Sequence, residues 1–294
     1  MKLLLVSNVL EHEAFPEFLR AAGAAHPDAD ILCAGDLLNV FPEPGEDFSG
    51  SMFHEIFGAR VVDEMRRLVE TGFSAADDSW LVEPLRDMLL PGGQSARRAL
   101  AIADARYVRL FAEITAALAG RRFHFIDGNM DYPALSCVRA SASPSLVSIS
   151  DRVVDVGGLS IAGLGGIPNT AHPFAGVVEI SPNEMSEAEY ERRLFRLAGA
   201  DILCTHLSPE EAPALARFVE LGHTRVLVCR APFDFRRVHD YRGRSSVRRV
   251  GDTWVITVRP FEWPAGSSLV IDLEPGAAPD VEVFSYAGVA RPAA

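Results

Sequence analysis

Four apolar stretches of this sequence each run directly into side chains that can bind a metal ion or an anion. The stretches are residues 3–6, 31–34, 123–126 and 202–205, and the polar residues that follow them are Asn8, Asp36, Asn129 with Asp131, and His206. Short apolar runs of this kind predict buried strands. Carboxylate, amide and imidazole groups are ligands for ions such as Mn, Fe or Zn. The spacing therefore indicates a polar site at the ends of several strands.

The order of these strings resembles the calcineurin-like metallophosphoesterase superfamily, whose signature runs D-x-H, G-D, G-N-H-D/E, a lone His and G-H-x-H. Gly35-Asp36 stands at G-D, Gly128-Asn129 at G-N, and His206 at the lone His. The resemblance covers roughly residues 1–275. It implies a β-sandwich flanked by helices, in α/β/β/α layers, with two metal ions at the strand ends that clamp a phosphate and generate hydroxide.

Half of the metal ligands that the resemblance implies are missing. At D-x-H the chain has Asn8-Val9-Leu10, so a neutral amide replaces a carboxylate and an alkyl group replaces an imidazole. Met130 replaces the His of G-N-H. The first metal therefore loses the ligands that belong to it alone, and we expect no dinuclear centre.

The last motif can be placed in two registers. Gly222-His223-Thr224-Arg225 resembles G-H-x-H and would give the second metal His223 as a ligand. Gly222, however, follows a predicted helix and has the position of a helix C-cap. Aligning strand ends instead puts Arg230-Ala231 at G-H and Phe233 at the last His. We favour this second register, which makes His223 a connector residue.

In the favoured register Asp36, Asn129 and His206 remain as metal ligands. They could hold one divalent ion weakly (Mn, Fe or Zn) or none, with water in the open positions. A guanidinium at Arg230 could neutralise Asp36 or grip an anionic ligand. With Asn8 and Asp131 these residues form the predicted anion-binding set, whereas no catalytic residue is assigned.

The surrounding pattern predicts an α/β protein. Residues 2–6 and 31–34 read as buried strands around a helix at 13–25, and residues 254–258, 268–273 and 281–284 read as antiparallel strands. A helix at 186–197 has a capping box, Ser186 with Glu189. The helical pattern at about 45–120 reads as an insertion over or beside the site. We expect a single domain over residues 1–285 and a loose tail at 286–294.

The composition limits which classes of partner and which cellular location we expect for this protein. A net charge of −12 argues against nucleic acid and anionic membranes. The four cysteines show no C-x-x-C spacing, and no run approaches a signal-peptide core or a membrane span. Lys2 is the only lysine among 28 basic residues, which indicates a GC-rich bacterial genome. The expected location is a bacterial cytoplasm.

Three functions are compatible with this sequence. The first is a degenerate metallophosphoesterase-like protein whose old cleft serves binding, assembly or a repurposed reaction, with a small anionic or phosphate-containing ligand. The second is a single-metal phosphoesterase or related hydrolase that uses Asp36, Asn129 and His206, with His223 or His12 as further candidates. The third is a non-catalytic scaffold subunit that binds a protein partner through the helical insertion. An open polar cleft would favour the first two, and a filled cleft the third.

Overall fold

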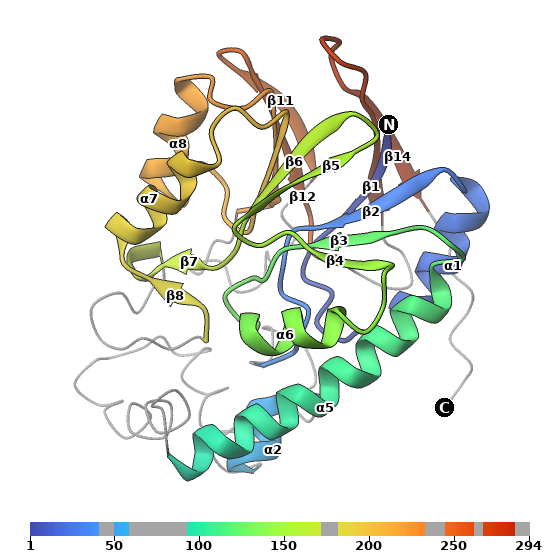
Figure 1. The fold of residues 1–294 in the computed structure, drawn as a ribbon, viewed down its shortest axis with the longest axis vertical. Helices are drawn as coiled ribbons and strands as arrows, with labels where there is room; N and C mark the ends of the chain where they lie inside the picture. Colours follow the sequence, from blue (N-terminus) through green and yellow to red (C-terminus); the bar gives the residue numbers. More distant parts are fainter. Residues whose placement is uncertain (41–49, 59–92, 172–181, 233–244, 262–266, 286–294) are drawn as a thin grey trace.

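A computed structural model describes residues 1–40, 50–58, 93–171, 182–232, 245–261 and 267–285. Two six-stranded sheets form the centre of the molecule, and helices cover both outer faces (Figure 1). Each sheet mixes parallel and antiparallel pairs.

The first sheet has the order β14-β13-β1-β2-β3-β4. Its strands are β1 Lys2–Val6, β2 Ala29–Cys33, β3 Phe123–Phe125, β4 Leu146–Ser148, β13 Ser267–Asp272 and β14 Asp280–Ser285. The strands from β1 to β4 are parallel, whereas β13 runs antiparallel to β1 and β14 antiparallel to β13. Three strands of this sheet that carry site motifs therefore end at the same edge.

The second sheet has the order β11-β12-β10-β9-β6-β5. Its strands are β5 Arg152–Val156, β6 Leu159–Leu164, β9 Ile202–Thr205, β10 Val226–Arg230, β11 Ser246–Val250 and β12 Thr253–Val258. A separate short pair joins β7 Ile167–Pro168 and β8 Glu184–Met185. The stretch 254–258, expected to be antiparallel, pairs antiparallel with β11 but parallel with β10, so that expectation was half right.

The helices form the two outer layers. Among the described residues they are α1 Phe15–Ala25, α2 Met52–Phe57, α5 Gln94–Ala117, α6 Pro133–Ala140, α7 Glu187–Arg196 and α8 Pro213–Glu220. A 3-10 turn, η2, lies at Asn169–Ala171. Ser186 caps α7 through its hydroxyl, which accepts the N–H of Glu189, as the sequence predicts. Helix α6, which begins at Pro133, was missed because an eight-residue helix between strands has too little periodicity to show.

Strand alternation divides the apolar residues among three cores. Leu4, Ile31 and Phe125 face α1 and α5, while Leu5, Leu32 and Ile126 face the second sheet. On the other side, the second sheet packs against α7 and α8 through residues such as Leu203 and Leu227. This gives the predicted α/β/β/α layers.

The described parts of the expected insertion are helical. Helix α5 packs on α1, α2 and α6 along the outer face of the first sheet (Figure 1). Residues 59–92 and the expected tail at 286–294 lie outside the described residues. Among the described helices, none combines the length and the apolarity that crossing a membrane requires.

Candidate functional site

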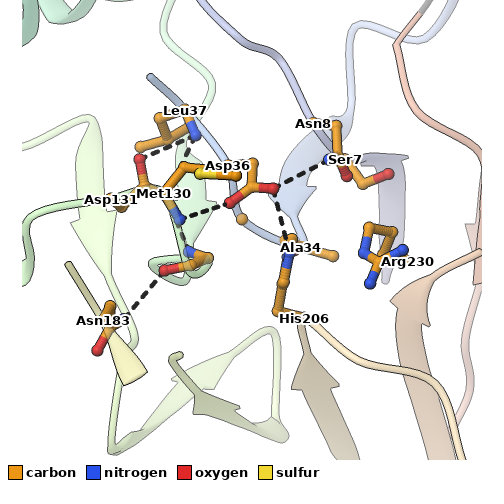
Figure 2. A network of polar contacts seen from close by, with 12 residues as sticks. Ser7, Asn8, Ala34, Asp36, Leu37, Met130, Asp131, Asn183, His206 and Arg230 are labelled. Atoms are coloured by element: carbon orange, nitrogen blue, oxygen red, sulfur yellow. Dashed lines mark hydrogen bonds and ion pairs between the residues drawn. The ribbon is translucent and has the colours of Figure 1, made fainter. Parts of the chain in front are cut away.

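The strand-end motifs meet where the two sheets approach each other. Asp36 follows β2 in the first sheet and His206 follows β9 in the second, and their side chains are in contact (Figure 2). His206 Nε2 lies 3.2 Å from Asp36 Oδ2, and the two side chains are 1% and 6% exposed. The sequence predicts that these two residues, which are far apart along the chain, share one site. It did not indicate that their side chains would be in direct contact.

Protein donors occupy both oxygens of the Asp36 carboxylate. Oδ2 accepts from Asn8 Nδ2 at 3.0 Å in addition to its contact with His206, and Oδ1 accepts from the N–H of Met130 at 3.1 Å. The carboxylate is thus tied to β1, to β3 and to β9 by the residues that follow these strands (Figure 2). In this arrangement Asp36 joins the two sheets at the strand-end edge.

The His206 ring is fixed at both nitrogens. Nδ1 lies 2.7 Å from the carbonyl oxygen of Ala34, which can only accept, so Nδ1 carries a proton. Its other nitrogen, Nε2, faces the carboxylate of Asp36. Both ring nitrogens therefore contact oxygen atoms of the loop that follows β2.

Several effects act on the pKa of Asp36. Burial raises it, but the charge of His206, the hydrogen bonds from His206 and Met130, and the more distant charge of Arg230 outweigh that effect. The pKa is lowered, and Asp36 is held as a carboxylate.

The loop that replaces D-x-H is held in an uncommon backbone conformation. Asn8, Leu10 and Glu11 have φ angles of 47°, 48° and 55°, in the left-handed region that few non-glycine residues adopt. Their N–H groups donate to the carbonyl oxygens of Gly35, Asp36 and Leu37, respectively. These paired backbone bonds fix the loop against the Gly35-Asp36 turn.

Asp131 organises the same turn from the other side. Its carboxylate accepts the N–H groups of Leu37, Leu38 and Gly128 and the hydroxyl of Tyr107 on α5. Burial and the nearby carboxylates of Asp127 and Asp36 raise the pKa of Asp131, while the backbone donors oppose the shift. Asp131 therefore connects α5 with two site loops.

A third buried carboxylate, Asp127, was not singled out from the sequence. It accepts hydrogen bonds from the hydroxyls of Ser136 on α6 and Ser150. Burial raises its pKa, and the two serine hydroxyls act in the opposite direction. No sequence signal marks these serines as its partners, because they lie 9 and 23 positions away in unrelated elements.

Arg230 has a carboxylate partner that the sequence did not indicate. Its guanidinium donates to Glu211 Oε1 at 2.8 Å and to the carbonyl oxygen of Ala231. The side chain in direct contact with Asp36 is His206, and the charge of Arg230 also lowers the pKa of Asp36. The sequence predicts that Arg230 partly replaces the missing metal charge at Asp36, and the structure adds Glu211 as the carboxylate that its guanidinium binds.

His223 lies in the connector between α8 and β10, as the favoured register predicts. Its ring packs against Phe195 and Phe218, with ring centroids 5.3 and 5.0 Å away. Phe233, which that register places at the last His, lies outside the described residues.

Asn129 lies at the predicted edge and is buried. Its carbonyl oxygen accepts the N–H of Asn183, and the Asn183 amide donates to the carbonyl oxygen of Gly128. Asn183, which directly precedes β8 (Figure 2), is thus hydrogen-bonded to the backbone of the Gly128-Asn129 loop.

Glu11 binds α5 and does not lean into the site. Its carboxylate accepts from Arg106 at 2.6 Å and from Arg109 at 3.0 Å, and also from the N–H of Asn39. Arg106 forms a second ion pair with Glu55 of α2. The loop that would carry the first metal's ligands is instead attached to the helical layer.

These donors do not fit a dinuclear centre. Leu10 offers no lone pair, and within the described ranges no three His, Cys, Asp or Glu side chains come together as a metal-binding group.

A single ion is chemically compatible with Asp36, His206 and Asn129. Asn8 Oδ1, which is buried and has no hydrogen-bond partner among the described residues, could join them. Fixing a ligating His through its other nitrogen is usual in metal sites, and the Ala34 contact does this for His206.

Known structures share this fold. The crystal structure of TT1561 of Thermus thermophilus aligns with a TM-score of 0.57 at 14% identity, covering 97% of this chain and 98% of that one. Another crystal structure gives a TM-score of 0.58 at 15% identity over the same shares. An archaeal phosphodiesterase is more distant, with a TM-score of 0.42 at 10% identity, over 97% of this chain and 99% of its own.

The structural neighbours are proteins of the metallophosphoesterase fold, so the fold predicted from the four motifs is confirmed. At these identities the likeness shows the fold alone. No protein-family model matches the sequence, and no curated protein matches it.

Proposed function

We propose that this chain is a degenerate metallophosphoesterase-like protein that lacks the dinuclear centre and serves a binding or assembly role. The proposal rests on one observation: groups of the protein already contact both carboxylate oxygens of Asp36. Its carboxylate accepts from Asn8, Met130 and His206, and it is almost fully buried. A carboxylate that bridges two metals needs its oxygens free for them.

Contacts within the chain take the place of the metals at Asp36. An unpartnered buried carboxylate is strongly unfavourable, and His206 Nε2 lies 3.2 Å from Asp36 Oδ2. The ligands of the second metal are thereby kept for the stability of the fold, while the loop of the first metal is attached to α5 through Glu11. All four cysteines are free, which supports the accompanying proposal of a cytoplasmic location.

A single-metal hydrolase is the second candidate. The buried, unpartnered Oδ1 of Asn8 and the anchored ring of His206 favour it. A divalent ion could bind His206 Nε2, with Asp36 and Asn129 as further ligands.

Hydrolysis assays separate the two candidates. We expect a phosphomonoester and a phosphodiester of p-nitrophenol, with added Mn²⁺, to be turned over no faster by the wild type than by Asp36→Asn. The Asn variant keeps the shape of the side chain and removes its charge, so it is the matched control. Mn²⁺-dependent turnover by the wild type that Asp36→Asn abolishes would establish the single-metal enzyme instead.

A further inference from the structure

Helix α5 exposes a groove beside α2. An open groove of about 410 Å³ is lined by Arg98, Ala101, Ile102, Ala105, Arg106 and Arg109 of α5 and by Glu55 of α2. Ala101 and Ala105 are exposed and form the floor with Ile102. Small side chains at this spacing let a second helix approach closely.

The charges within the groove are largely balanced inside the chain. Arg106 pairs with Glu11 and Glu55, and Arg109 pairs with Glu11. Arg98 donates only to the carbonyl oxygens of Glu55 and Ile56, and in the part of the chain that the structure describes it has no carboxylate partner. Among the described residues, one positive charge is therefore left without a carboxylate at the N-terminal end of the groove.

A matching negative charge lies at the other end of the same helix face. Glu113 is one turn beyond Arg109, is exposed, and forms no ion pair within the described residues. Arg98 and Glu113 are about 22 Å apart along the helix axis, too far to meet within one chain. A two-fold axis near Ala105 and Arg106 would bring Arg98 of each copy to Glu113 of the other.

We propose that the outer face of α5 is the interface of a homodimer, in which two copies of the helix pack antiparallel across the alanine floor. A two-fold interface is self-complementary. This face has small, apolar residues near its centre, beside the ion-paired Arg106 and Arg109, and opposite charges at its ends. The interface lies away from the Asp36–His206 contact, so the proposal does not depend on the function of that site.

A charge-swap series tests the dimer by sedimentation velocity. The wild type should dimerise at micromolar concentration, and Glu113→Arg should raise the dimer dissociation constant about tenfold or more, because it places two cations opposite each other at both ends. Arg98→Glu should also weaken the dimer, and the double variant Arg98→Glu/Glu113→Arg should restore it. Circular dichroism melts verify that each variant is folded.

Arg196→Glu on α7 is the control, since it changes the net charge in the same sense as Arg98→Glu on an exposed site outside the groove. It should leave dimerisation unchanged. A wild type that still sediments as a monomer at about 100 μM would overturn the proposal and leave the groove to an acidic partner of another kind. If the dimer of the double variant were weakened by the sum of the two single effects, the proposed pairing of Arg98 with Glu113 would equally be overturned.

Discussion

Replacing Asp131 with Ala should lower the free energy of unfolding by about 4 kcal/mol or more. The substitution leaves the N–H groups of Leu37, Leu38 and Gly128 and the hydroxyl of Tyr107 without their acceptor. Each buried donor left unsatisfied costs about 1–3 kcal/mol, and these costs are only partly additive. Urea denaturation followed by circular dichroism measures the change.

Tyr107→Phe is a milder change in the same hydrogen-bond network. It removes one donor to Asp131 and the acceptor of the Tyr132 N–H, while the three backbone bonds to the carboxylate remain. We expect a loss of about 1–2 kcal/mol. This variant remains measurable if Asp131→Ala does not fold. Equal stability of Tyr107→Phe and the wild type would contradict the role given to the link between α5 and the site loops.

Arg106→Ala should destabilise the protein by about 3–5 kcal/mol, because it leaves the buried carboxylate of Glu11 without its main partner. The side chains of Arg106 and Glu11 are only 9% and 7% exposed. The pKa of Arg106 is raised by Glu11 and Glu55 even though burial acts to lower it, which agrees with a guanidinium held by its carboxylates. Thermal and urea unfolding would both report the loss.

Arg109→Ala is the matched control, because Arg109 binds the same carboxylate of Glu11 from the surface. Its side chain is 63% exposed, so we expect a loss of at most about 1 kcal/mol. If the two arginine variants lost equal stability, burial of the Arg106–Glu11 pair would not be what anchors the loop after β1.

The parts of the fold that follow from local pattern were predictable from the sequence. Apolar runs followed by Gly35-Asp36, Gly128-Asn129 and His206 located strand ends. Parallel pairing brought the first two of these ends to one edge of the first sheet, whereas His206 comes to the site from β9 of the second sheet. The position of His223 was also readable, because Gly222 after an amphipathic helix marks a helix end and not a strand-end motif.

The partners of the buried charges could not be read in the same way. Glu211 lies in a loop before α8, where nothing in the local sequence distinguishes it from its exposed neighbours, yet it takes the guanidinium of Arg230. Tyr107 has the spacing of a core residue on α5, and only the packing of that helix brings its hydroxyl to Asp131. Contacts of this kind depend on the relative placement of elements, which periodicity does not encode.

We propose that the Asp36–His206 contact stands where a dinuclear centre would otherwise be. Elemental analysis of protein purified without chelator tests this proposal. We expect at most a single transition-metal ion per chain, bound weakly enough to be lost on dialysis. A pair of transition-metal ions per chain that survives dialysis would contradict it.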